Sequence, residues 1–300
     1  MPRKLPFGTA PLVSALPPTT GQYFFVHNSG SNNSSGKKPE SPLATIDYAI
    51  GLCTASAGDV IVVMPGHAES ISGAGAIAAD VAGIQIIGLG TANLRPTITL
   101  HTTATTIAVS AANVTFRNLI IKTDVDAVVK VFNITAAGCT LDAVDFAETA
   151  SCACLQFALT SAAADDLVIQ NCKWVQTQTA ATALAQWIVL IGADRATIKN
   201  NFLNLKGFAT SNPANGAVVG ATTASNDVEI GNNRFIVTNS TGNIPISMLA
   251  NSTGYIYGNY CASGKSAIAG QVAAANCYCA ENYVNNTVNL SGLLDPVVDS

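Results

Sequence analysis

Apolar residues recur at alternate positions in short segments that repeat along most of the chain. In each segment a central apolar residue has a small or apolar residue two positions before it, and the positions between them are mostly polar. A period of two is typical of a half-buried β-strand. The central residues are Ile86, Phe116, Leu141, Ile169, Ile198, Ile230, Ile256 and Cys279. They lie between 23 residues (Ile256 to Cys279) and 32 residues (Ile198 to Ile230) apart, so each repeat is predicted to contain one such strand.

A repeat of this length, without room for long helices, can bury its apolar face only by stacking on its neighbours. The pattern therefore predicts an all-β protein, a parallel β-solenoid of about eight to nine coils. Equivalent residues would lie about 4.8 Å apart along the axis. Asparagines two positions after the centre are expected to face inward and to form a hydrogen-bonded ladder. These are Asn118, Asn171, Asn200 and Asn232.

The segment before the repeats has a helical pattern. Its apolar residues at helical spacing are Ile46, Ala49, Ile50 and Cys53. Ser41 and Pro42 would supply a capping residue and a first-turn proline. A short helix within residues 41–57 is therefore expected to cover the open edge of the first coil. Residues 58–300 would form the β-helix with a C-terminal cap, and residues 1–40 an extended N-terminal arm and linker.

Composition narrows the classes of function. Charged residues make up 11% of the chain and hydrophobic residues 49%, with a formal net charge of −4. This balance excludes disorder over the whole length and predicts neither nucleic acid nor a membrane as partner. No apolar stretch is long enough to span a bilayer, and prolines interrupt the apolar run that a signal peptide needs. We therefore expect synthesis in a reducing compartment and interpret the eight cysteines as core residues.

Three motifs together resemble the pectin-lyase-like right-handed β-helix superfamily. They are T-I-x-x-A-I at residues 45–50, G-D-x-I-x-V-x-P-G at residues 58–66 with Glu69 nearby, and N-V-T-I-x-N-x-x-F-like units such as that beginning at Asn113. The resemblance covers roughly residues 42–285 and implies a single-stranded, right-handed parallel β-helix. It implies no single activity, because the superfamily includes polysaccharide lyases, glycoside hydrolases, esterases, phage tailspikes and phage capsid decoration proteins.

The sequence contains few residues that could form a catalytic site. The outward acids Asp142 and Glu229 would lie three rungs apart, about 14 Å. Paired-carboxylate catalysis needs roughly 5 to 9.5 Å. His67 and Glu69 suit a hydrogen-bonded pair, but no further residue lies at metal-ligand spacing beside them. We therefore expect no catalytic residue, no metal site and no cofactor, and hence a protein that is not an enzyme.

The N-terminal arm combines basic residues with scattered apolar ones. With the β-helix, this arm resembles the phage capsid decoration, or cement, proteins, which commonly form trimers and bind the capsid shell. The resemblance implies a virion structural protein, made in the host cytoplasm and located on the capsid surface. It would bind and stabilise the major capsid protein as a homotrimer. The expected capsid-binding residues are Arg3, Lys4, Leu5, Phe7, Leu12 and Leu16.

The alternative is a glycan-binding or glycan-cleaving protein, similar to a tailspike or a polysaccharide lyase. Its support is a group of outward tyrosines on the last rungs, Tyr255, Tyr257 and Tyr278. Their rings could stack on sugars or pack against another subunit.

Overall fold

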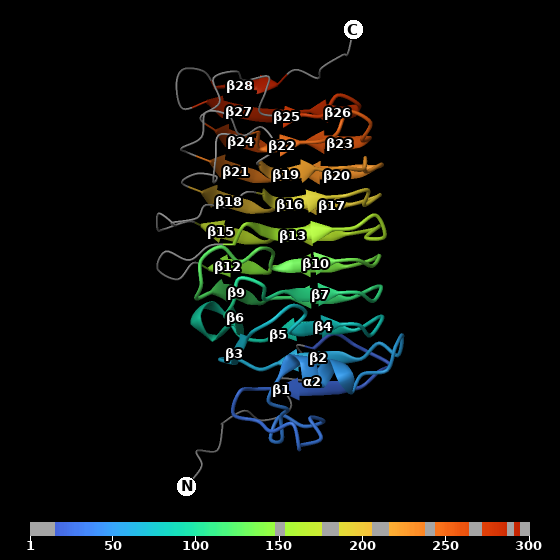
Figure 1. Cartoon of the computed structure of the whole chain (residues 1–300), viewed down its shortest axis with the longest axis vertical. Coiled ribbons are helices and arrows are strands. Elements are labelled where there is room, and N and C mark those ends of the chain that lie inside the picture. Colours follow the sequence, from blue (N-terminus) through green and yellow to red (C-terminus); the bar gives the residue numbers. More distant parts are fainter. Residues whose placement is uncertain are drawn as a thin grey trace.

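The computed structural model describes residues 16–147, 154–175, 186–205, 216–237, 244–263, 272–286 and 291–294. Within these ranges the chain winds through three sheets in turn and forms a right-handed parallel β-helix (Figure 1). The predicted fold class is confirmed. No helix in these ranges has the length and apolar character that crossing a bilayer requires.

Each coil from β2 to β25 contributes one strand to each sheet, and the three sheets hold ten, ten and eight strands within the described residues because the first and last coils are incomplete. The first sheet consists of β1 (Tyr23–Val26), β2 (Val60–Val63), β5 (Gln85–Gly88), β8 (Thr115–Arg117), β11 (Thr140–Asp142), β14 (Val168–Gln170), β17 (Thr197–Lys199), β20 (Val228–Gly231), β23 (Gly254–Tyr257) and β26 (Cys277–Ala280). The second consists of β3 (Ala68–Ile71), β6 (Thr97–Leu100), β9 (Ile120–Thr123), β12 (Asp145–Ala147), β15 (Lys173–Val175), β18 (Phe202–Leu205), β21 (Arg234–Val237), β24 (Tyr260–Ser263), β27 (Asn282–Asn286) and β28 (Ser291–Leu294). The third consists of β4 (Ile77–Ala79), β7 (Ile107–Val109), β10 (Phe132–Ile134), β13 (Gln156–Thr160), β16 (Gln186–Leu190), β19 (Gly216–Gly220), β22 (Ile246–Ser247) and β25 (Val272–Ala273). The final pair, β27 with β28, is antiparallel.

The repeat centres lie in register along the first sheet. Phe116 pairs with Leu141, and Leu141 pairs with Ile169. The same row continues through Ile198, Ile230, Ile256 and Cys279. The period-two pattern therefore predicted both the strand and its pairing, because a one-residue slip would turn every apolar side chain outward.

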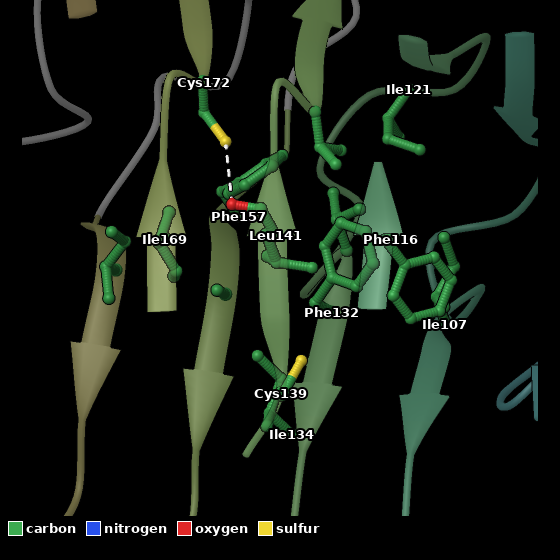
Figure 2. Packing of buried hydrophobic residues seen from close by; sticks show 14 of the residues in the cluster. Ile107, Phe116, Ile121, Phe132, Ile134, Cys139, Leu141, Phe157, Ile169 and Cys172 are labelled. Atoms are coloured by element: carbon green, nitrogen blue, oxygen red, sulfur yellow. Dashed lines mark hydrogen bonds between the residues drawn. The ribbon is translucent and has the colours of Figure 1, made fainter. Parts of the chain in front are cut away.

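The core is one continuous column of buried side chains. The Phe132 ring contacts those of Phe116 and Phe157 edge to face, with ring centroids 5.4 and 5.5 Å apart (Figure 2). Cys139 and Cys172 lie among these apolar residues, and the seven cysteines in the described ranges are free thiols. Burial raises the pKa of the Cys139 thiol to about 12. The interpretation of the cysteines as core residues holds for the five buried ones, whereas Cys53 and Cys279 are half-buried and pack against the edge of the core.

The expected asparagine ladder exists, but at different residues. Asn118, Asn171, Asn200 and Asn232 have φ values of 54 to 57° and form the tight turn between the first and second sheets. Asparagine tolerates this left-handed conformation better than most residues, which explains the repeat. The buried ladder is formed instead by Asn201, Asn233, Asn259 and Asn282. The prediction for the first four was therefore wrong, because the position after the strand turns the chain before the ladder begins.

The base of the β-helix is covered by helix α2 (Ile46–Gly51), which buries Ile46, Ala49 and Ile50. The helix begins later than Ser41–Pro42 suggested, and Thr45 caps it. Leu43 delays the start because its backbone bonds to Phe25 and His27, which keeps the segment before the helix extended. A short 3₁₀ helix, η1 (Ala92–Leu94), follows β5. Strand β1, which we expected within the arm, pairs with β2 and forms the first rung of the first sheet.

Candidate functional site

The outer face of the first sheet carries a cluster of polar and aromatic side chains near its C-terminal end. Strands β17, β20, β23 and β26 stack in register there. One outward row consists of Thr197, Glu229, Tyr255 and Tyr278. The neighbouring outward row consists of Lys199, Gly231, Tyr257 and Ala280. All three tyrosines predicted from the sequence therefore lie in one place.

Tyr257 lies across the rung below it. A Cβ atom on Gly231 would be 2.5 Å from the Cζ atom of Tyr257, so the ring fills the space that a side chain at Gly231 would need. From there the Tyr257 hydroxyl donates a hydrogen bond of 2.6 Å to Oε1 of Glu229. This hydrogen bond is the main reason why the pKa of Tyr257 is raised above its ordinary value.

Glu229 is held from the other side as well. Its Oε2 atom accepts a hydrogen bond of 3.5 Å from the Thr197 hydroxyl, and it lies 3.9 Å from Nζ of Lys199. The Glu229 and Lys199 side chains are each 36% exposed, so solvent weakens their attraction. The contacts nevertheless fix the direction of the Glu229 carboxylate beside the tyrosine rings.

Tyr255 and Tyr278 form an exposed aromatic pair. Their ring centroids are 5.0 Å apart with an interplanar angle of 48°. The two residues are 58% and 54% exposed. Large aromatic rings are normally among the residues that a fold buries, so an exposed pair on a regular sheet marks a surface available for contact.

Two of the tyrosines, Tyr255 and Tyr257, and two acids border a hollow of about 440 Å³. We call it the tyrosine hollow, and it is lined by Asp227, Val228, Glu229, Gly254, Tyr255 and Tyr257. Its volume is in the range of small-molecule sites, about 300 to 1,000 Å³. Gly254 lets β23 approach β20 closely at this point, because a Cβ atom there would lie 2.1 Å from the Val228 carbonyl oxygen.

Unlike that of Glu229, the carboxylate of Asp227 makes no hydrogen bond or ion pair within the described residues. It is an exposed turn residue with φ of 54°. In the part of the chain that the structure describes, only its backbone N–H makes a recorded hydrogen bond, to the Thr253 hydroxyl. The neighbouring cation, Arg195, is bound to Asp165 and Asp166 instead. The hollow therefore combines apolar ring surface with free carboxylate oxygens, which suits a ligand with both an apolar face and hydroxyl groups.

The predicted capsid-binding residues are separate from this site. Arg3, Lys4, Leu5, Phe7 and Leu12 lie outside the described residues. Leu16 is described, and it is 8% exposed. It packs on the outer face of the first sheet at the opposite end from the hollow, in the cluster Leu16, Phe25, Val60, Val62, Met64 and Ile87.

Two other candidates have structural roles. Glu69 lies 3.1 Å from Nε2 of His67 and also accepts a hydrogen bond from the backbone N–H of Ile46, so the pair ties helix α2 to β3. Asp142 is engaged by Arg117 at 3.2 Å and by Asn171 at 2.7 Å. No group of three or more His, Cys, Asp and Glu side chains in the described ranges is arranged to hold a metal ion.

Sequence reasoning missed Asp227 and the two glycines of the site. It considered Glu229 only as a partner for Asp142 and did not pair it with Tyr257. The available signal was an outward glycine, Gly231, opposite a tyrosine, because the gap that glycine leaves is filled by the neighbouring ring.

Comparison with known proteins finds solved structures of low sequence identity and low structural similarity. No protein-family model and no curated protein matches the chain. A rhamnogalacturonan lyase structure matches with 11% identity over 92% of this chain and 90% of that one, with a TM-score of 0.45. A pectin methylesterase from Aspergillus niger matches with 13% identity over 93% of both chains, with a TM-score of 0.42. A GH136 lacto-N-biosidase from Eubacterium ramulus matches with 8% identity over 88% of this chain and 68% of that one, with a TM-score of 0.38.

All three of these structures are named as enzymes. This finding contradicts the expectation that the chain is not an enzyme, and we withdraw that expectation. Identities of 8 to 13% show likeness of fold alone, so none of the three activities is transferred to this chain. The chain has a right-handed parallel β-helix fold.

Proposed function

We propose that this protein binds glycans and that the tyrosine hollow holds a sugar ring. The observation that carries the proposal is the exposed Tyr255–Tyr278 pair beside the carboxylates of Asp227 and Glu229. A sugar ring has one apolar face, which stacks on an aromatic ring, and hydroxyl groups at its edge, which donate to carboxylate oxygens.

The site is prepared before a ligand arrives. Tyr257 is fixed over Gly231 by its hydrogen bond to Glu229, and the strands below belong to a continuous parallel sheet. A preformed site loses little side-chain freedom on binding, which favours affinity. Exposed tyrosines are well suited to this role because they carry a large contact area with few rotatable bonds.

The test is a binding titration with a panel of oligosaccharides, comparing the wild type with Tyr255→Ala. We expect the substitution to weaken binding roughly 2- to 10-fold for the lost ring contact. Tyr283→Ala is the matched control, because Tyr283 is 55% exposed on β27 in the second sheet. Equal losses in the two variants, or no binding of any glycan by the wild type, would reject the proposal. Chain shortening in the same incubations would extend it from binding to cleavage.

A second candidate is a structural role on a virion, supported by the apolar cluster around Leu16. Leu16 contacts the outer face of the first rungs, and the carbonyl of Pro17 accepts a 2.7 Å hydrogen bond from the Tyr23 hydroxyl. Leu16 and Pro17 therefore attach the start of the described chain to the base of the β-helix. A segment anchored in this way would suit attachment to a major capsid protein, with three copies of the chain side by side.

This second candidate is tested by deleting residues 1–15 while keeping Leu16. We expect the truncated protein to stay folded, because the described β-helix begins after the deletion, and to lose addition to purified capsids. The mass of the full-length protein in solution should be that of a trimer. A truncated protein that still decorates capsids, or a monomeric full-length protein, would reject this role.

A further inference from the structure

The tyrosine hollow is rich in hydrogen-bond acceptors and poor in donors. Among the lining residues that the structure describes, Asp227 and Glu229 supply carboxylates that only accept. The two tyrosines supply hydroxyls, but the Tyr257 hydroxyl already donates to Glu229. Among these lining residues, the Tyr255 hydroxyl is the side-chain donor without a hydrogen bond to another part of the chain that the structure describes. A ligand in the hollow must therefore bring its own donors.

The negative charge of the hollow also favours a ligand that donates hydrogen bonds over one that carries a negative charge. Lys199 is the cation of the cluster, and it lies beside Glu229 at 3.9 Å, on the rung away from Tyr255. Asp227 has no ion pair within the described ranges, since Arg195 is bound to Asp165 and Asp166. An incoming carboxylate, sulfate or phosphate would meet an uncompensated negative charge and few donors, and both raise the free energy of binding.

We infer that the hollow selects a neutral, hydroxyl-rich sugar ring over an acidic one. This inference rests on the proposed glycan-binding function and names the ligand class of the same site. Hydroxyl groups donate to Asp227 and Glu229 without bringing a second negative charge beside them, and the apolar face of the ring packs on Tyr255. The same ring with a carboxylate in place of its primary alcohol keeps the stacking contact and loses the favourable electrostatics.

The experiment uses pairs of oligosaccharides that differ only in that group. One pair is cellohexaose and its C6-oxidised form, and the other is hexagalacturonate and its carboxyl-reduced form. Binding of the full chain is measured by calorimetry at low and high salt. We expect the neutral member of a pair to bind at least about 10-fold more tightly at low salt, with the ratio shrinking as salt screens the charges.

Asp227→Asn is the diagnostic variant. It removes the charge, adds an amide donor and keeps the shape, and asparagine already occupies the same left-handed conformation in this chain at Asn200 and Asn232. We expect Asp227→Asn to bring the neutral-to-acidic ratio close to one. Glu229→Gln should lower the ratio less, because Lys199 already offsets part of that charge.

The outcomes separate this inference from the proposed function. If the acidic member binds as tightly as the neutral one, or if Asp227→Asn leaves the ratio unchanged, the selectivity is rejected. The glycan site itself still stands in that case provided that Tyr255→Ala weakens binding. If neither member of either pair binds, the selectivity is rejected, and the site is rejected as well when no glycan of the panel binds.

Discussion

At the scale of single residues, the buried asparagines show how a polar side chain is accommodated in the core. Asn233 donates from Nδ2 to the Ile198 carbonyl at 2.8 Å and to Oδ1 of Asn259 at 2.9 Å. Its own Oδ1 accepts from the backbone and side-chain nitrogens of Asn201, both at 3.0 Å. Every polar atom of the amide is therefore paired, which removes the usual cost of burial.

Asn233→Ala should lower the free energy of unfolding by about 3 kcal/mol or more. The change leaves the Ile198 carbonyl and the Asn201 backbone N–H without their partners, at roughly 1–3 kcal/mol for each buried group. Urea unfolding measures the effect. Asn204→Ala on β18 is the control, since Asn204 is only half-buried, and we expect a change within about 0.5 kcal/mol. Similar losses for both would contradict the ladder's role.

Two glycines should respond in opposite directions to the same substitution. Gly254→Ala places a methyl group 2.1 Å from the Val228 carbonyl oxygen, at φ of 143°, and should cost roughly 2–5 kcal/mol. Gly51→Ala meets no atom within 4 Å in helix α2 and should stabilise by roughly 0.5–1 kcal/mol. Thermal unfolding of the two variants compares them, and a tolerated Gly254→Ala would contradict the close approach of β20 and β23.

At the scale of elements, helix α2 depends on its surroundings. Six residues are too few for an isolated helix to be stable in water. The helix exists because Ile46 and Ile50 pack on the first coil and because polar groups satisfy its start. Thr45 accepts a hydrogen bond from the backbone N–H of Tyr48, and Glu69 accepts one from that of Ile46. The helix therefore covers the open edge of the first coil, and its contacts with that coil stabilise it.

Thr45→Ala should destabilise this cover by about 1 kcal/mol, the usual cost of losing a capping side chain. Hydrogen exchange of the α2 amides should become faster, while exchange in β14 to β20 stays unchanged. Thr91→Ala is the matched control, because Thr91 precedes η1 without making a side-chain capping bond. Faster exchange throughout the β-helix would show instead that α2 does not unfold as a separate unit.

At the scale of the whole molecule, the stacked coils bury thiols that the unfolded chain would expose. Burial raises the pKa of Cys139, Cys172 and Cys261 from the ordinary 9.0 to about 12. The unfolded state then releases these protons at a lower pH than the folded state does. Their contribution to stability is present below about pH 9 and is lost as pH rises toward about 12.

We therefore expect the free energy of unfolding to fall between pH 9 and 11, with each of these thiols contributing up to about 1.4 kcal/mol per pH unit. Urea unfolding at several pH values measures the slope. Other groups titrate in this range, so Cys139→Ala is the comparison. Its slope should be smaller than that of the wild type by the share of one thiol, and an equal slope would contradict the assignment.

The sequence by itself determined the solenoid, the strand in each repeat and the register of Phe116, Leu141 and Ile169. These follow from a local period of two and from the stacking of equivalent strands, because equivalent positions of successive repeats then pair with each other. Only the tertiary structure decided which asparagines are buried and how Tyr257, Gly231 and Glu229 meet. Those contacts join residues on different rungs, and they depend on the turn geometry and on the space that a missing side chain leaves, neither of which a one-dimensional pattern records.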